Sequence, residues 1–285
     1  MYIPNLSDSS PLKPDYLRQL DQWSFTGVMW SVTVSSLLFL TLPTVIVLIT
    51  SFGAGETLRF PPSDLSLKWY ISLLDLPEIH ETALTSLKLA FLTTVICVVL
   101  GVCAALALAS SQTGWVQAMD TLVMSPLALP GLAVGLGILI FFNLIGYGIN
   151  FNVLLISHVV ICVPFIVRTT LASLSQLSSS LKDASTSLGA TQIYTFFHVT
   201  LPLIQRGVIT GAFITFLSSF DNLTVSLFLS DARNQVLPIQ MWSMIENNLD
   251  IRVAAIAGIV VILTAVLMTA MEQASGLSQF FMSRR

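Results

Sequence analysis

Six long apolar runs constrain this chain more than any other feature of its sequence. They cover approximately residues 27–51, 82–110, 123–145, 153–174, 208–229 and 253–271. A helix needs about 20 residues to cross the roughly 30 Å hydrocarbon core of a bilayer, and each run is about that long or longer. The mean hydropathy is +0.84 and only 9% of residues are charged, far from the composition of a soluble domain. The sequence therefore predicts an all-α membrane protein with six transmembrane helices.

The segments between and around these runs predict a simple domain organisation. Residues 1–26 hold three prolines and mixed charges and lack the early apolar core of a secretory signal, so we interpret them as an uncleaved tail. Residues 27–81 form the first transmembrane helix and an outer loop, residues 82–272 the main transmembrane domain, and residues 273–285 a second tail. The net charge of −3 gives no reason to expect nucleic acid as a partner.

The orientation in the membrane follows from the positive charges. An even number of spans returns both termini to one side, and that side holds more Lys and Arg than the other. The terminal side has Lys13, Arg18, Arg168, Lys182, Arg206, Arg284 and Arg285, and the opposite side has Arg59, Lys68, Arg233 and Arg252. Because Lys and Arg are enriched on the cytoplasmic side, the sequence predicts that both termini and the loop at residues 177–203 are cytoplasmic.

That loop is a polar segment of two short predicted helices between very apolar runs. Leu177, Leu181, Ala184 and Leu188 fall on one stripe at helical spacing. Gly189 follows at the position where a helix often ends with a residue of positive φ. Thr191 can then cap a second short helix that ends at residue 197, and Pro202 is expected to close the unit. A bent pair of helices on a membrane protein is typical of a docking element.

The same loop resembles a family motif. Asp183-Ala184-Ser185, Leu188-Gly189-Ala190, Phe196, Val199 and Leu201-Pro202 resemble the EAA loop of ABC-importer permeases. In that family the loop forms coupling helices that sit in a groove of the cytoplasmic ATPase. The resemblance implies that contacts with the ATPase are made by Asp183, Ala184, Ser185, Gly189, Ala190, Leu201 and Pro202. Asp183 stands where the family usually has Glu, which keeps the charge and shortens its reach, and Ser185 stands where Ala is often found.

The run at 208–229 carries a polar stripe around one carboxylate. Asp221 lies about 13 residues into the run, or roughly 20 Å along a helix, and an ionised Asp at that depth must face protein or water. The stripe comprises Thr215, Ser218, Ser219, Asp221, Asn222 and Ser226. Such a stripe fits a hydrated pathway for a cationic or hydrogen-bonding solute. It equally fits hydrogen bonding between helices that holds the bundle together.

Residues around this stripe extend the resemblance. Ser219-Phe220-Asp221-Asn222, Ser226-Leu227-Phe228-Leu229, Leu237-Pro238, Met241-Trp242 and Met244-Ile245 resemble the second permease of spermidine/putrescine-type importers. The resemblance implies a type I, MetI-like permease fold in the bacterial inner membrane. It also implies a second permease subunit, a dimer of ATPase subunits and a periplasmic solute-binding protein as partners. The substrate path would include Ser218, Asp221, Asn222, Ser226 and Trp242.

The substrate class that the resemblance implies is a polyamine or a related amine. The same branch of the family also carries amino-acid-like amines and organophosphorus compounds, which stay open as alternatives. The chain has no G-x-x-x-x-G-K-[ST] loop, so we expect no cofactor on this chain and place ATP and Mg²⁺ on the partner ATPase.

Two other classes of protein fit the sequence less well. An intramembrane enzyme with Asp221 as acid or base would need a second titratable group at membrane depth, and His158 stands at no evident spacing to pair with it. A channel or secondary transporter would leave the bent loop at 177–203 unexplained. Cys97, Cys103 and Cys162 all lie in apolar runs, and we expect them to be small buried residues with no metal site and no disulfide.

Glycine and proline predict where helices pack closely or kink. Gly131 and Gly135, and likewise Gly207 and Gly211, have the small-xxx-small spacing that permits close approach of two helices. Pro126 and Pro130 predict a kink within the run at 123–145.

Overall fold

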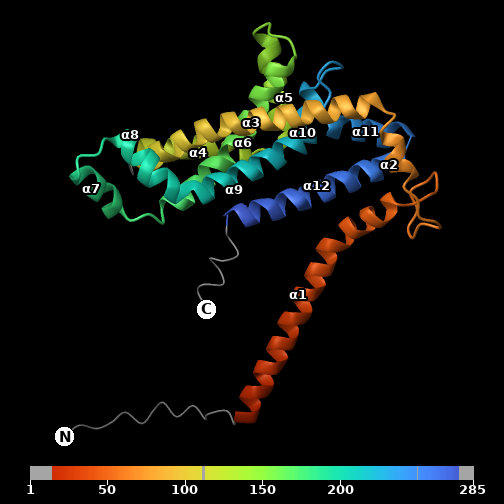
Figure 1. Cartoon of the computed structure of the whole chain (residues 1–285), viewed down its shortest axis with the longest axis horizontal. Helices are drawn as coiled ribbons and strands as arrows, with labels where there is room; N and C mark the ends of the chain where they lie inside the picture. Colours follow the sequence, from red (N-terminus) through yellow and green to blue (C-terminus); the bar gives the residue numbers. More distant parts are fainter. Residues whose placement is uncertain (1–14, 111–112, 249, 276–285) are drawn as a thin grey trace.

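The computed structural model describes residues 15–110, 113–248 and 250–275, and this part of the chain is built from helices (Figure 1). The helices are α1 Asp15–Ser51, α2 Lys68–Leu73, α3 Pro77–Ala109, α4 Gly114–Ala128, α5 Gly131–Leu144, α6 Phe151–Leu174, α7 Ser179–Ser187, α8 Gln192–Thr195, α9 Leu201–Phe220, α10 Leu223–Leu229, α11 Leu237–Asn248 and α12 Arg252–Ser275. A π-helical segment, η1 Phe196–Thr200, joins α8 to α9.

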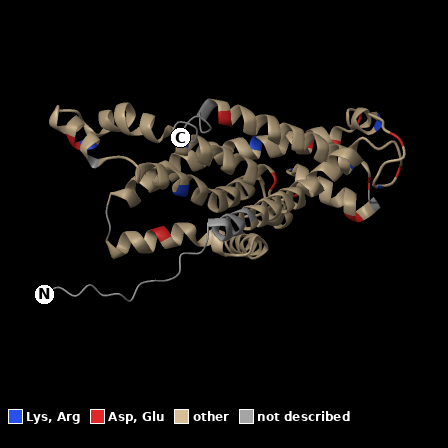
Figure 2. Ribbon diagram, turned by 90° about the horizontal axis from the view of Figure 1, so that it is seen from below, with Lys and Arg blue, Asp and Glu red and all other residues tan. Residues whose placement is uncertain are grey.

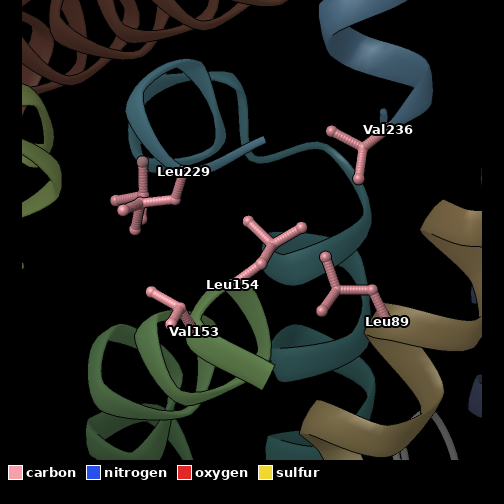
Figure 3. Packing of buried hydrophobic residues seen from close by; sticks show 6 residues of the cluster. Leu89, Val153, Leu154, Leu229 and Val236 are labelled. Carbon is pink, nitrogen blue, oxygen red and sulfur yellow. The ribbon is translucent and has the colours of Figure 1, made fainter. Parts of the chain in front are cut away.

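A bundle of long helices forms the body of the molecule. Helices α3, α6 and α9 pack against one another, and α12 packs against α9 and α1. Figure 1 shows α7 and α8 at one end of this bundle and α2 at the other, with α1 leaving the bundle at the α2 end. One buried cluster joins α3, α6 and α10 through Leu89, Val153, Leu154, Val225, Leu229 and Val236 (Figure 3). The all-α membrane fold is confirmed.

The predicted termini agree with the structure only in part. The first predicted span lies inside α1, but this helix already begins at Asp15, within the segment expected to be a tail. Residues 1–14 lie outside the described residues. At the other end, α12 runs to Ser275, and the remainder of the predicted tail also lies outside them.

The predicted span at 123–145 is not one kinked helix. Helices α4 and α5 form an angle of 106°, so the structure has five helices that can cross a membrane, or six if this bent pair counts as one, within the part of the chain that is described. Leu129, which precedes Pro130, is extended (φ −94°, ψ 145°) because the proline ring disfavours helical geometry in the residue before it. The sequence predicted a kink here, whereas the chain turns through more than a right angle.

The predicted span at 208–229 was wrong in both its start and its continuity. Helix α9 begins at Leu201 and ends at Phe220. Asn222 is extended (φ −78°, ψ 99°), and its Oδ1 accepts a hydrogen bond of 3.0 Å from the Val225 N–H, which starts α10. Asp221 therefore lies at a break between two helices and not within one.

The bent loop forms largely as predicted, except at its end. Gly189, two residues after the end of α7, has a φ of +83°, and the Thr191 hydroxyl accepts from the Tyr194 N–H at 3.3 Å to start α8. Pro202 does not close the unit, because α8, η1 and α9 form one 29-residue helix, Gln192–Phe220. The π-helical turn of η1 ends two residues before Pro202, which has no N–H for the regular helical hydrogen bond.

Both glycine pairs lie at close helix contacts, as their spacing predicted. Gly207 and Gly211 face α6: a Cβ on Gly207 would lie 2.6 Å from the Thr169 carbonyl oxygen, and one on Gly211 would lie 3.2 Å from Ile166 Cα. Gly135 of α5 packs in the same way on α10, where a Cβ would lie 3.2 Å from Val225 Cα.

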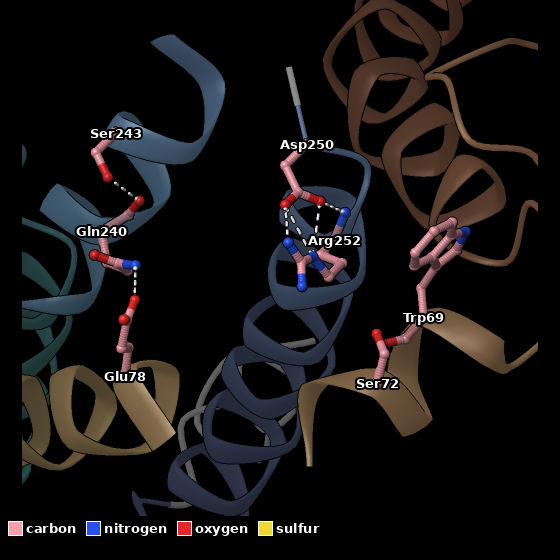
Figure 4. A network of polar contacts seen from close by, with 7 residues as sticks. All are labelled: Trp69, Ser72, Glu78, Gln240, Ser243, Asp250 and Arg252. Atoms are coloured by element: carbon pink, nitrogen blue, oxygen red, sulfur yellow. Dashed lines mark hydrogen bonds and ion pairs between the residues drawn. The ribbon is translucent and has the colours of Figure 1, made fainter. Parts of the chain in front are cut away.

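Charged residues are sparse along the helices and more frequent near α2 and the loop before it (Figure 2). At this end Gln240 donates to Glu78 at 3.3 Å, and Arg252 binds Asp250 through several hydrogen bonds (Figure 4). The hydrogen bonds from Arg252 lower the pKa of the Asp250 carboxyl. These contacts tie the start of α11 to α3 and the start of α12 to the loop before it.

Substituting Gly207 tests the packing of α9 on α6. Gly207→Ala should lower the unfolding free energy by about 1–3 kcal/mol, the usual cost of extra volume in a packed core. Thermal unfolding of the purified protein in detergent measures this, with Gly137→Ala as control because nothing lies within 4 Å of a Cβ there. Equal effects of the two substitutions would contradict this contact.

Candidate functional site

A cavity of about 1070 Å³ opens between the two broken helices, with walls contributed by α6, α11 and α12. Pro126, Leu127 and Gly131 line it from the α4–α5 break, and residues 217, 218 and 220–225 line it from the α9–α10 break. The two breaks also touch, because a Cβ on Gly131 would lie 2.6 Å from the Thr224 Oγ1. Two interrupted helices thus meet at one cavity.

Asp221 is the only charged side chain among the described residues that line this cavity. It is solvent-exposed in this chain, and Ser218 and Asn222 line the cavity beside it. Asp221 also ends α9, where the last carbonyl groups of the helix give a partial negative charge. Most of the other lining residues are apolar. The arrangement places a negative centre in an apolar chamber, which favours a cation that carries hydrocarbon.

The predicted polar stripe splits between two roles. Ser218, Asp221 and Asn222 line the cavity, whereas Thr215, Ser219 and Ser226 are buried against α6. His158 of α6 lies 2.9 Å from the Ser219 hydroxyl and 3.1 Å from the Ser226 hydroxyl. Ser226, predicted on the substrate path, therefore belongs to a hydrogen-bonded contact between helices.

His158 was missed as the partner of these serines. It is fully buried in α6, and its two ring nitrogens connect the two helices on either side of the α9–α10 break. Sequence spacing gave a partial signal, since Ser219 and Ser226 are seven residues apart and would share a helix face. Their common partner lies 61 and 68 residues away along the chain, beyond the reach of any periodicity.

Trp242 does not reach the cavity. It lies on α11 and is exposed, whereas Pro238 and Met241 of the same helix line the cavity wall.

The cysteines were predicted to be buried, which is correct for Cys97 and Cys162 and wrong for Cys103, which is exposed.

Three of the seven residues predicted to couple to an ATPase, Ser185, Gly189 and Ala190, line a second, open groove. This groove, of about 820 Å³, is lined by Leu181, Ser185, Leu188, Gly189, Ala190, Thr191, Tyr194, His198 and Val199. The hydroxyls of Ser185 and Thr195 lie 2.8 Å apart and tie α7 to α8. Asp183 and Ala184 are exposed on α7, whereas Leu201 and Pro202 belong to the start of α9.

Apolar side chains are strongly exposed around this groove. Leu188 is 89% exposed and Ile193 is 73% exposed, on the two sides of Gly189. Exposed apolar side chains gathered on a polar loop are typical of a surface that contacts another protein or the membrane. Among the described residues, no group of His, Cys, Asp and Glu is arranged to hold a metal ion.

A family model described as "Binding-protein-dependent transport system inner membrane component" matches residues 97–275. The chain is 25% identical to the spermidine/putrescine transport system permease protein PotC of Haemophilus influenzae, over 78% of this chain and 87% of that protein. It is 25% identical to the putrescine transport system permease protein PotI of Escherichia coli K12, over 78% and 81% of the two chains. It is 26% identical to the putative 2-aminoethylphosphonate transport system permease protein PhnV of Salmonella paratyphi A, over 88% and 96%.

Solved structures share the fold. A bacterial ABC transporter that imports the acidic polysaccharide alginate has a TM-score of 0.69 at 15% identity, covering 92% of this chain and 98% of that chain. The inward-facing MetNI methionine ABC transporter has a TM-score of 0.59 at 18% identity, covering 72% and 97%.

Replacing His158 tests its structural role. His158→Leu leaves two buried hydroxyls without their shared partner, so the unfolding free energy should fall by about 1–3 kcal/mol. Thermal unfolding in detergent measures the change, with His80→Leu as the exposed control. Unchanged stability combined with lost transport would instead assign His158 to the substrate path.

Proposed function

The chain belongs to the family of inner membrane components of binding-protein-dependent transport systems, and we propose that it helps to form the translocation path for a polyamine or a related small amine. It is a multi-pass permease subunit of an ABC importer and not an enzyme, since ATP hydrolysis belongs to a partner ATPase. The observation that carries the proposed substrate class is the single carboxylate of Asp221 at a helix break inside an apolar cavity.

The electrostatics of this cavity support an amine. A charge pair is worth about 1 kcal/mol at 4 Å in bulk water and about four times as much at an effective dielectric constant near 20. The apolar walls beside the exposed Asp221 carboxylate lower the effective dielectric constant below that of bulk water, so a substrate ammonium gains more here than it would in solution. The C-terminal end of α9 adds to the same negative potential.

The apolar walls also suit the body of such a substrate. Polyamines carry methylene chains between their ammonium groups, and side chains such as Leu127, Phe165 and Met241 can contact these methylenes. Relatives named as spermidine/putrescine and putrescine permeases support this class. A relative named as a putative 2-aminoethylphosphonate permease also supports an amine-bearing organophosphorus compound as the second candidate.

We place the groove around Gly189 against a cytoplasmic ATPase, with ATP and Mg²⁺ bound by that subunit. This orientation also puts both termini in the cytoplasm, as the distribution of Lys and Arg predicts. A second permease subunit and a periplasmic solute-binding protein complete the proposed importer. The exposed apolar side chains of Leu188 and Ile193 would be covered by the ATPase.

Neutralising Asp221 tests the substrate path. The complex of this chain with its second permease and ATPase is reconstituted in proteoliposomes, and uptake of spermidine or putrescine is measured with the loaded binding protein. Asp221→Asn should lower uptake at least about tenfold, the equivalent of about 1.4 kcal/mol, while assembly and thermal stability stay unchanged. Asp231→Asn is the control, because Asp231 does not line the cavity.

Two results would count against this role of Asp221. Failed assembly of the Asp221→Asn complex would make the residue structural. Normal uptake would remove it from the path. If the unaltered complex responds to 2-aminoethylphosphonate and not to polyamines, the second candidate replaces the first.

Charging the docking groove tests the coupling surface. Leu188→Glu places a carboxylate where a partner would bury an apolar side chain, and copurification of the ATPase should be lost. Thr186→Glu is the matched control, since Thr186 is exposed in the last turn of α7, two residues before Leu188, and does not line the groove. Retained ATPase binding by Leu188→Glu, or equal loss in both variants, would contradict docking at this groove.

A further inference from the structure

An ion pair joins α4 to α6 between the cavity and the end of the bundle that carries α7. Arg168 Nη2 lies 3.4 Å from Asp120 Oδ2. Asp120 is six residues from the start of α4 and Arg168 is six residues from the end of α6, so both lie about 9 Å inside the bundle from those helix ends. Those ends face α7 and the docking groove. Hydropathy alone did not point to Asp120, because the predicted span began at residue 123.

The pair lies on the helix faces that line the cavity. On α6, Ile161 and Phe165 line the cavity, and Arg168 continues their face at helical spacing, one turn further toward α7. On α4, Leu127 lines the cavity, and Asp120 is seven residues, or two turns, closer to the same end. The ion pair therefore lies between the cavity and the end of the bundle that carries the docking groove.

The Asp120 carboxylate is only half satisfied. Its Oδ2 binds Arg168, but its Oδ1 is buried and has no hydrogen-bond partner. A buried acceptor without a donor is unfavourable, and a charged group inside a transmembrane helix is normally paired or placed on an ion or substrate path. Asp120 thus has an open position for one more donor.

Helix α4 buries little of its surface against the rest of the bundle. Among its described residues none is buried, and it packs mainly against α6 and α3. The Asp120–Arg168 pair is thus a specific polar connection on a helix with little buried surface. Loss of this pair would weaken the contact between α4 and α6.

We propose that Asp120 and Arg168 form an ionic gate at the inner end of the cavity and that Asp120 is a second binding site for the ammonium of the substrate. The gate is closed while the two side chains are paired. An ammonium that leaves Asp221 donates to Asp120 and displaces Arg168, so one cation replaces another and the carboxylate is never left unpaired. The identity of this ligand rests on the proposed function, whereas the gate itself rests on the position of the pair.

Access to a thiol introduced into the cavity tests the gate directly. Ser218→Cys places this thiol on the cavity wall, and Cys103→Ser removes the exposed native thiol. Cys97 is buried, and Cys162, which also contributes to the cavity wall, is buried as well. The complex is studied in inside-out membrane vesicles, in which the docking groove faces the medium. The rate at which a charged, membrane-impermeant reagent labels the introduced thiol then reports access from that side, and the same protein with Ser218 retained gives the background.

Neutralising either partner should open the gate. Asp120→Asn and Arg168→Gln should each raise the labelling rate by up to about fivefold, which corresponds to about 1 kcal/mol for a partly exposed pair. The exchanged double variant, Asp120→Arg with Arg168→Asp, should return the rate toward its original value. Rates unchanged by both single substitutions, or raised equally in the exchanged variant, would overturn the gate.

A second arm separates the gate from the proposed substrate. Binding protein loaded with spermidine and enclosed in the vesicle lumen, together with ATP in the medium, should raise labelling of the introduced thiol in the chain with its native ion pair, and Asp120→Asn should remove this further increase. If neutralising Asp120 or Arg168 raises the labelling rate but spermidine changes that rate in neither the unaltered chain nor the variants, the gate stands and the polyamine assignment fails. If spermidine is transported and Asp120→Asn transports it at the normal rate, Asp120 is not a binding site for it.

Discussion

The bilayer offers no hydrogen bonds to exposed peptide groups, and this constraint organises the whole molecule. A break in a transmembrane helix leaves backbone N–H and C=O groups without partners, so it is tolerated only where protein or water surrounds it. This chain has two such breaks in its described part, after Ala128 and after Phe220, and both line the same cavity. The Asn222 side chain satisfies one freed N–H, and contact between Gly131 and Thr224 holds the breaks together. The cavity is thus the place where both breaks are sheltered from lipid.

Local chemistry was enough to predict most of the helices and their close contacts. Hydropathy located the long helices, Gly189 and Thr191 located the bend between α7 and α8, and the small-residue spacings located contacts with α6 and α10. Each of these depends on a few neighbouring residues. The end of α9 did not follow in this way, because Asp221 lies in an apolar run whose composition is compatible with a continuous helix. An asparagine three residues before a helix N–H was the available signal for the break.

The division of the polar stripe could not be predicted from α9 and α10 alone. Which hydroxyl faces a cavity and which faces a neighbour depends on the residues of α6, and the buried His158 decides this by binding Ser219 and Ser226. Ser218 and Asp221 are then left on the cavity side. The same packing explains why the sequence suggested two roles for one stripe. One face of the stripe lines the cavity, and the other forms hydrogen bonds with α6. The position of the Trp242 side chain likewise depends on how α11 is rotated about its axis. In this structure the rotation brings Met241, and not Trp242, to the cavity.

One continuous helix connects the docking groove to the cavity. Residues Gln192–Phe220 form 29 residues of helix, about 44 Å long, which begins beside Gly189 and ends at Asp221. The π-helical turn keeps this helix intact across Pro202, where a regular hydrogen bond is missing. A helix pinned to α6 at Gly207 and Gly211 cannot bend easily between its ends, because the backbones are already in contact. In the proposed importer, movement applied at the groove would therefore reach the Asp221 carboxylate as displacement of this stiff helix.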